Sequence, residues 1–353
     1  MARSRARVTD GPWFQIWKRY RQRKLAMAGL SLVSLMLIIG FLAPVLANKD
    51  EHPLLCRYDG KIQAPALKEL TWNVPGMKYV LPKSQPFSQV TFNLRKRMKP
   101  ERGDWAIWSP IPHGPNSTSQ AVLQRPSAEH WLGTDETGRD VASRMIHGAR
   151  VSMLVGFVSM AIAGSIGLVL GSLSGFFGGW VDMVVSRIIE VIICFPTFFL
   201  ILSVMVWLKP SIWNVMIVIG ITGWTGIARL VRGEFIRLRS VDFAVAATAL
   251  GATPGRIIFK HILPNSLAPV FVPITFGIAG AILTEAGLSY LGFGVQQPNA
   301  SWGNILREGF DNIFTSAHMI TPPCIAIFVA VLSYNLVGDR LRDVADPRLR
   351  GSR

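Results

Sequence analysis

The sequence predicts an all-α polytopic membrane protein with six transmembrane helices and a long extracytoplasmic insert after the first of them. Half of the 353 residues are apolar and only 16% are charged, whereas a soluble domain carries about 25% charged residues. Several uncharged runs also reach the ~20 residues that a helix needs to cross a bilayer core of about 30 Å. Because unpaired backbone groups are not tolerated in hydrocarbon, we expect these runs to be helices.

The first predicted span covers residues 25–47, which are 23 residues without a charge. A basic stretch precedes it, and Val45 and Ala47 resemble the small residues of a signal-peptide cleavage site. The run is nevertheless longer than the roughly 7–15 apolar residues usual in a signal peptide. We therefore interpret it as an uncleaved anchor, with a secretory signal as the alternative.

Residues 48–148 differ from everything around them. They contain ten prolines and many charges, and no apolar run in them is long enough to span a bilayer. We expect an extramembranous domain, whose fold the pattern does not specify because Pro and Gly interrupt every short alternating stretch.

Five further largely apolar runs bring the number of predicted spans to six. They cover residues 151–181, 188–208, 211–228, 265–284 and 317–337.

Basic residues near the spans predict the orientation of the chain. Residues 1–24 hold eight basic groups and one acid, residues 229–264 hold six basic groups, and the chain has five arginines from Arg340 onward. With six spans these segments fall on one side, which the positive-inside rule makes cytoplasmic. The predicted organisation is a cytoplasmic N-terminus (1–24), a first helix (25–47), a periplasmic insert (48–148), a membrane core (149–340) and a cytoplasmic tail (341–353).

The net charge of +16 would indicate a nucleic-acid partner in a soluble chain. Here about half of the basic residues orient membrane helices, so we expect no nucleic acid. Three distant cysteines offer neither a disulfide framework nor a C-x-x-C site. The insert holds His52, His113, His130 and His147, but no two of them have metal-ligand spacing, and no hydrolase string is present. We therefore predict no metal and no catalytic residue, which disfavours a membrane-anchored enzyme.

Two carboxylates fall in or at the edges of the predicted spans. Glu190 lies three residues after Arg187, a spacing typical of an ion pair on one helix face. Glu285 lies just after the fifth run. A proton-driven carrier is expected to bury acids or histidines in mid-helix, and the sequence places none clearly there. A secondary carrier or channel is therefore the less favoured interpretation.

The basic loop after the fourth span has the pattern of a helical hairpin. Residues 241–250 read as a short helix with small residues on one face, and Gly251 fits the position just after the C-cap. Pro254 then fits the first turn of a second helix. The string His261-Ile262-Leu263-Pro264-Asn265 leads into the fifth span.

This loop resembles the cytoplasmic loop of permease subunits of binding-protein-dependent ABC importers, whose consensus is E-A-A, three residues, G, nine residues, I-x-L-P. Ala246, Ala247, Gly251, Leu263 and Pro264 fall in register. Two positions depart, because Val245 replaces the family's Glu and His261 its Ile. Nothing is inferred from those two side chains.

Two more strings resemble the dipeptide/oligopeptide/nickel (C-type) branch of this family. The run from Trp131 to Arg144 is similar to its L-G-T-D-x-x-G-R-D-V signature. The run from Glu285 to Gly294, with Ser301-Trp302-Gly303, is similar to its second signature, E-A-x-L-S-F-L-G-x-G…S-W-G. Taken singly, the glycines would make turns and the aspartates would cap helices. The resemblance marks these residues as an extracytoplasmic family signature: Gly133, Asp135, Gly138, Arg139, Asp140, Glu285 and Gly292. The long insert is also similar to that of the microcin C and oligopeptide sub-branch.

The resemblance implies a type I ABC importer permease core with a coupling loop at residues 231–264. The loop would dock on a separate ATP-binding subunit, with Arg237, Arg239 and Arg256 facing acids on it. Further implied partners are a second homologous permease, one or two ATP-binding subunits and a periplasmic solute-binding protein, all at a bacterial inner membrane. The chain has no G-x-x-x-x-G-K-[ST] loop, so we expect ATP on the partner and no cofactor on this chain. The expected cargo is a peptide or peptide-like compound, with a nickel chelate or another small solute as the alternative.

Overall fold

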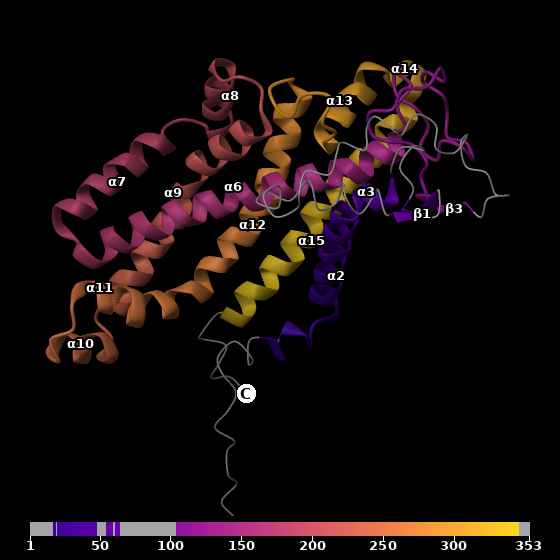
Figure 1. Cartoon of the computed structure of the whole chain (residues 1–353). Coiled ribbons are helices and arrows are strands. Elements are labelled where there is room, and N and C mark those ends of the chain that lie inside the picture. The colour runs from indigo at the N-terminus through magenta and orange to yellow at the C-terminus, as the bar shows by residue number, and fades with distance from the viewer. Residues whose placement is uncertain (1–16, 19, 48–53, 59–60, 64–103, 346–353) are drawn as a thin grey trace, which may run out of the picture.

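The computed structural model describes residues 17–18, 20–47, 54–58, 61–63 and 104–345 as a bundle of helices with a small sheet at one end (Figure 1). The longer helices are α2 (Lys24–Phe41), α6 (Val141–Phe177), α7 (Gly179–Ile193), α8 (Thr197–Trp207), α9 (Ile212–Leu238), α12 (Leu263–Tyr290) and α15 (Thr321–Ala345). The shorter elements are α3 (Ala43–Leu46), α10 (Asp242–Ala249), α11 (Pro254–Arg256), the π-helical η4 (Ile257–Ile262), α13 (Trp302–Asp311), α14 (Ile313–Ser316) and η5 (Ala317–Met319).

Five helices are long and apolar enough to cross a membrane: α2, α6, α9, the Pro269–Tyr290 part of α12, and α15. The pair α7 and α8 passes the same test when taken together, which gives a sixth span. The predicted all-α polytopic fold is confirmed. The predicted boundaries shift, because α6 already begins at Val141, inside the segment assigned to the insert. The loop between α9 and α12 is also shorter than the predicted 231–264, because these helices continue to Leu238 and restart at Leu263.

The third predicted span differs most from expectation. The sequence predicted one helix over residues 188–208, but α7 ends at Ile193 and α8 begins at Thr197, with an angle of 84° between them. Pro196 occupies the N-cap position of α8. Because proline has no backbone N–H and its ring clashes with the preceding turn, a continuous helix through this residue is disfavoured.

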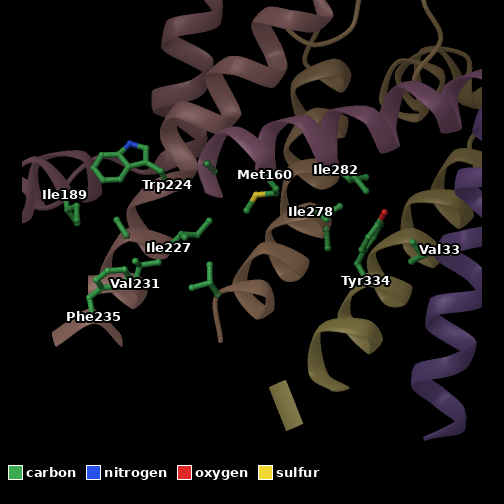
Figure 2. Close-up of a cluster of buried hydrophobic side chains, with 14 of the residues drawn as sticks. Val33, Met160, Ile189, Trp224, Ile227, Val231, Phe235, Ile278, Ile282 and Tyr334 are labelled. Atoms are coloured by element: carbon green, nitrogen blue, oxygen red, sulfur yellow. The ribbon is translucent and has the colours of Figure 1, made fainter. Parts of the chain in front are cut away.

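A stripe of glycines lets α6 and α9 pack with their backbones in close contact. A Cβ atom at Gly167 would lie 2.8 Å from Ile227 Cβ, one at Gly171 would lie 2.5 Å from the Ala228 carbonyl oxygen, and one at Gly175 would lie 2.6 Å from the Arg232 carbonyl oxygen. Stripes of small residues are the usual means by which membrane helices approach this closely. The buried cluster beside this contact draws mainly on α2, α6, α7, α9, α12 and α15 (Figure 2).

The two ends of the bundle carry different structures. One end, called here the hairpin end, carries α10 and α11 (Figure 1). The opposite end carries α13, α14 and an antiparallel sheet of order β2-β1-β3, formed by Lys61–Gln63, Leu55–Tyr58 and Trp105–Ile107. This sheet belongs to the predicted insert, of which residues 48–53, 59–60 and 64–103 lie outside the described part of the chain.

Candidate functional site

The loop at residues 239–262 forms the helical hairpin that its sequence predicts. Helix α10 ends at Ala249, and Gly251 follows with φ +79°. The Gly251 N–H donates to the Thr248 carbonyl and the Ala252 N–H to the Ala247 carbonyl, both at 3.0 Å. This pair of bonds is the Schellman arrangement, in which glycine adopts the left-handed conformation at low cost. The prediction of Gly251 as the residue after the C-cap is confirmed.

The two faces of α10 have different surroundings. Ala244 and Ala247 are buried and belong to one apolar cluster with Ile257 and Ile258 of η4. Ala246 is exposed on the outer side. Large apolar side chains accompany it there. The exposed ones on or beside α10 are Val241, Phe243, Val245 and Leu250, the last with 88% exposure. The hairpin therefore presents an apolar outer face.

The hairpin is joined to α12 without a flexible break. Pro254 starts α11, η4 follows at once, and Leu263 and Pro264 form the first turn of α12. Ile262, at the junction, is fully buried. Helix α10 therefore packs against η4, which continues directly into α12.

The three arginines expected to face a partner have different environments. Arg237 pairs with Glu234 at 2.5 Å on the same exposed helix face. Arg239 donates to the carbonyls of Gly175 and Phe176 at 3.4 and 3.2 Å, at the end of α6. Arg256 is exposed on the hairpin itself. Arg237 thus lies on α9, Arg239 is the C-cap residue of α9 at the start of the hairpin, and Arg256 lies within the hairpin.

A partly buried ion pair near the hairpin end was not predicted from the sequence. Arg232 Nη2 of α9 donates to Asp182 Oδ2 of α7 at 2.6 Å, and its Nε donates to the other oxygen. Ser174 Oγ of α6 donates to Asp182 as well, at 2.5 Å. The pair therefore holds three helices together. No local spacing signals it, because its members are 50 residues apart. The predicted pair of Arg187 with Glu190 is confirmed at 2.6 Å, and it is exposed.

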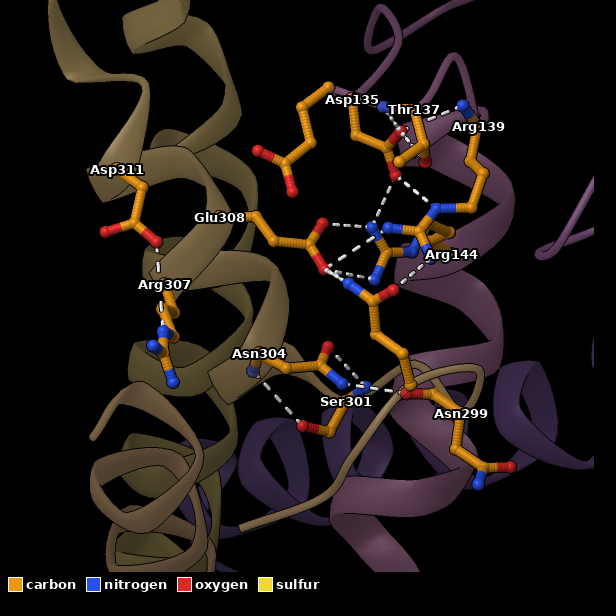
Figure 3. A network of polar contacts seen from close by, with 12 residues as sticks. Asp135, Thr137, Arg139, Arg144, Asn299, Ser301, Asn304, Arg307, Glu308 and Asp311 are labelled. Atoms are coloured by element: carbon orange, nitrogen blue, oxygen red, sulfur yellow. Dashed lines mark hydrogen bonds and ion pairs between the residues drawn. The ribbon is translucent and has the colours of Figure 1, made fainter. Parts of the chain in front are cut away.

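At the opposite end, the first signature string builds a buried ion-pair network (Figure 3). Arg139 Nε and Arg144 Nη1 both donate to Asp135 Oδ2 at 2.6 Å. Arg144 also donates through Nη2 to Glu308 Oε1 at 2.8 Å and through Nη1 to Glu308 Oε2. All four side chains are buried. The network links the loop before α6, the first turns of α6, and α13.

Burial by itself raises the pKa of Asp135, but other contacts outweigh it. The backbone N–H of Arg139, the charge of Arg144 and the hydroxyl of Thr137 together hold the pKa of this carboxyl below its ordinary value. The carboxylate is therefore the stable form, as a partner of two guanidinium groups must be.

The remaining residues of the first string shape the same loop. Gly133 and Gly138 have φ of +77° and +76°, and a Cβ on either would fall within 2.3 Å of a carbonyl oxygen. Asp140 is the N-cap of α6, where it accepts a hydrogen bond from the Ser143 N–H at 2.7 Å. The expectations of turn glycines and of a capping aspartate are confirmed for these three residues. Gly292, in the second string, also has a positive φ of +88°.

Glu285 lies inside α12 rather than after the span, and it is fully buried. Ser289 Oγ donates to its Oε1 at 2.6 Å and Ser152 Oγ to its Oε2 at 3.3 Å. The Trp302 N–H in turn donates to Ser152 Oγ at 3.2 Å. The two signature strings therefore meet, through α6, at the same end of the bundle.

A cavity of about 260 Å³ lies between α6, α8, α9 and α12. Three threonines from three helices line it, namely Thr197, Thr222 and Thr284. Glycines line much of the rest. A Cβ on Gly226 or Gly280 would meet nothing within 4 Å. The surface is therefore apolar with a few hydroxyls, and side chains can be added at Gly226 and Gly280 without a clash.

Comparison with known proteins places these features in a family. The family described as "Binding-protein-dependent transport system inner membrane component" matches residues 167–351, and the "N-terminal TM domain of oligopeptide transport permease C" matches residues 11–63. The oligopeptide transport system permease protein OppC of Bacillus subtilis is 32% identical over 96% of this chain and 90% of its own length. The dipeptide transport system permease protein DppC of Alkalihalophilus pseudofirmus is 43% identical over 65% of this chain and 75% of its own length.

A third relative covers nearly the whole chain. The inner membrane ABC transporter permease protein YejE of Escherichia coli is 32% identical over 94% of this chain and 96% of its own length. Among solved structures, an inward facing form of the MetNI methionine ABC transporter matches with a TM-score of 0.47 and 21% identity, over 57% of this chain and 96% of that one. The matches to the family and to relatives over most of the chain show that this protein belongs to the inner membrane components of binding-protein-dependent transport systems.

Proposed function

We propose that this chain is one permease subunit of an ATP-driven importer of peptides or peptide-like compounds. The names of its relatives support the cargo, because they are permeases for oligopeptides and dipeptides. A glutathione permease of Pectobacterium atrosepticum, 38% identical over 225 residues, fits the same class. A nickel chelate or another small solute is the alternative cargo of this branch.

The observation that carries the proposal is the hairpin at residues 239–262. It exposes an apolar face on α10 and is joined through η4 directly to α12. Apolar side chains exposed together on a helix are typical of a protein contact. We propose that this face docks on an ATP-binding subunit, which supplies the hydrolysis that this chain does not perform. The hairpin end then faces the cytoplasm with both termini, and the opposite end faces the periplasm and a solute-binding protein.

The cavity lined by Thr197, Thr222 and Thr284 is the proposed wall of the solute pathway. Hydroxyls on an apolar surface offer hydrogen bonds to peptide groups of varied sequence. A second, homologous permease would close the other side, and rocking of the two against each other would alternate access.

Docking is tested with one exposed apolar side chain at each end of the bundle. Leu250 on the hairpin is 88% exposed and Phe314 on α14 is 100% exposed. We expect Leu250→Asp to abolish co-purification of the ATP-binding subunit and permease-dependent ATP hydrolysis in proteoliposomes. Phe314→Asp is the matched control and should keep both. Equal recovery of the ATP-binding subunit with both variants would refute the docking proposal.

The pathway is tested with glycines that have open space. Leucine at Gly226 projects into the cavity, whereas leucine at Gly233, two turns along the same helix, lies outside it, and neither position has an atom within 4 Å of an added Cβ. We expect Gly226→Leu to stop uptake of a labelled tripeptide while subunit assembly persists. Gly233→Leu should retain uptake. Normal uptake by Gly226→Leu would remove the cavity from the pathway.

A further inference from the structure

A histidine from the segment after β3 meets an adjacent glutamate and histidine near the start of α6. They are His113, Glu129 and His130, and one ligand atom from each lies within 4.8 Å of the others. The rings of His113 and His130 are stacked, with centroids 4.4 Å apart and planes inclined by 28°. In the part of the chain that the structure describes, this is the one group of three such residues close enough to share a metal ion.

His130 is held in the orientation that metal ligands require. Its Nδ1 lies 2.8 Å from Asp140 Oδ2, and both side chains are buried. Because a carboxylate only accepts hydrogen bonds, Nδ1 carries a proton, and Nε2 is the ring nitrogen that a metal ion can bind. A carboxylate behind a histidine is the usual support of a ligating imidazole, since it fixes the ring and raises its basicity. The turn is also held by its backbone, because the Gly133 N–H donates to the His130 carbonyl at 2.9 Å.

His113 carries a polar atom that the protein leaves unsatisfied. Its Nε2 is buried and has no hydrogen-bond partner. Buried polar atoms are normally paired, so each exception needs an explanation. A metal ion bound in the plane of the His113 ring would supply one, because it would take the lone pair of this nitrogen.

We propose that His113, Glu129 and His130 bind a divalent transition-metal ion of the zinc type. Two imidazoles and one carboxylate, with water in the fourth position, are a known ligand set for Zn²⁺. Ligand atoms 2.0–2.1 Å from Zn²⁺ lie about 3.4 Å apart in a tetrahedron. Separations of up to 4.8 Å therefore need to contract by up to about 1.4 Å. Because an imidazole binds a metal in its own ring plane, the His113 ring also has to turn out of its stack with His130. Glu129 is exposed, which leaves its side chain room to rotate toward the imidazoles.

The ion would join two parts of the chain that the helices alone do not connect. His113 belongs to the segment that follows β3, whereas His130 and Glu129 belong to the turn that leads into α6. Asp140 supports His130 and at the same time caps α6. The site thus clamps the insert onto the first turn of the longest membrane helix. It does not depend on the proposed cargo or on the ATP-binding partner.

The test measures Zn²⁺ binding to the full chain in detergent micelles, purified with a tag that contains no histidine and stripped with a chelator. Equilibrium dialysis against Zn²⁺ should give one tightly held ion per wild-type chain. We expect His113→Ala and Glu129→Gln to lose that ion at the same free Zn²⁺. Asp140→Asn should bind about 10–100-fold more weakly, as is typical for a lost supporting carboxylate.

Three controls separate a built site from loss of folding or adventitious binding. Asn caps helices as well as Asp, so Asp140→Asn should keep its unfolding temperature without metal. His261→Ala removes a histidine at the hairpin end and should keep the ion. Mg²⁺, which prefers oxygen ligands, should not compete. A wild-type chain that retains no Zn²⁺, or a Glu129→Gln chain that retains as much as the wild type, would overturn the proposal.

Discussion

The contact between α6 and α9 gives a quantitative prediction for one methyl group. In Gly171→Ala the added Cβ would lie 2.5 Å from the Ala228 carbonyl oxygen and 2.8 Å from Val231 Cβ, whereas ordinary contact begins at 3.4 Å. The deficit of 0.9 Å falls on backbone atoms, so no rotamer change relieves it. Either α9 moves away by almost 1 Å or the local backbone distorts.

The expected cost follows from the behaviour of overpacked interiors, where an extra methylene destabilises by about 1–3 kcal/mol. Alanine also gains about 0.5–1 kcal/mol over glycine inside a helix. The net expectation for Gly171→Ala is a loss of about 0–2.5 kcal/mol in the free energy of unfolding, centred at ~1 kcal/mol. Gly233→Ala on α9 makes the same chemical change with nothing within 4 Å of the new atom. It should therefore gain about 0.5–1 kcal/mol from helix propensity alone.

The assay is equilibrium unfolding in mixed micelles of increasing SDS content, followed by tryptophan fluorescence. Trp224 is buried in the cluster beside this contact and will report its separation (Figure 2). The decisive result is the free energy of unfolding relative to wild type, which should fall in Gly171→Ala and rise in Gly233→Ala. If both alanine variants are stabilised alike, the glycine stripe does not set the distance between the helices.

Three more perturbations test other parts of the structure. Arg144→Met leaves buried Glu308 without its main partner and should cost about 3–5 kcal/mol of unfolding free energy, whereas Arg307→Met, at an exposed pair, should cost under ~1 kcal/mol in the same assay. The pKa of Asp135 is lowered in the folded protein, so the ionised carboxylate contributes its full stabilisation of the fold above pH of about 4, near the unfolded value. That contribution is lost as pH falls through the folded pKa. The unfolding temperatures of wild type and Asp135→Asn should thus converge on acidification. Gly251→Ala forces a left-handed alanine and should cost about 1–2 kcal/mol locally, seen as faster hydrogen exchange in α10.

Local patterns were sufficient to predict the hairpin. The end of α10, the glycine after it and the proline that restarts the helix are determined by a few neighbouring residues. The turn glycines Gly133 and Gly138 and the cap Asp140 were predictable for the same reason. Such features depend on backbone conformation, which short stretches of sequence specify.

Features that depend on tertiary contact were not predictable. Hydropathy finds a long apolar run at residues 188–208 but does not reveal that Pro196 breaks it, because prolines are tolerated in many membrane helices. Arg144 and Glu308 are 164 residues apart, so no spacing links them. The same holds for His113 and His130, whose separation in the sequence resembles no metal motif although their rings are stacked.

The length of α6 has a mechanical consequence. Its 37 residues make a rod of about 55 Å at 1.5 Å per residue, well beyond a hydrocarbon core of about 30 Å. The buried charges of Arg144 lie at one end of this rod, and the glycine contact with α9 lies toward the other. A rotation of 5° about either end would move the other end by about 5 Å. Helix α6 can therefore act as a lever, in which a small change among ion pairs at one surface becomes a displacement at the opposite one.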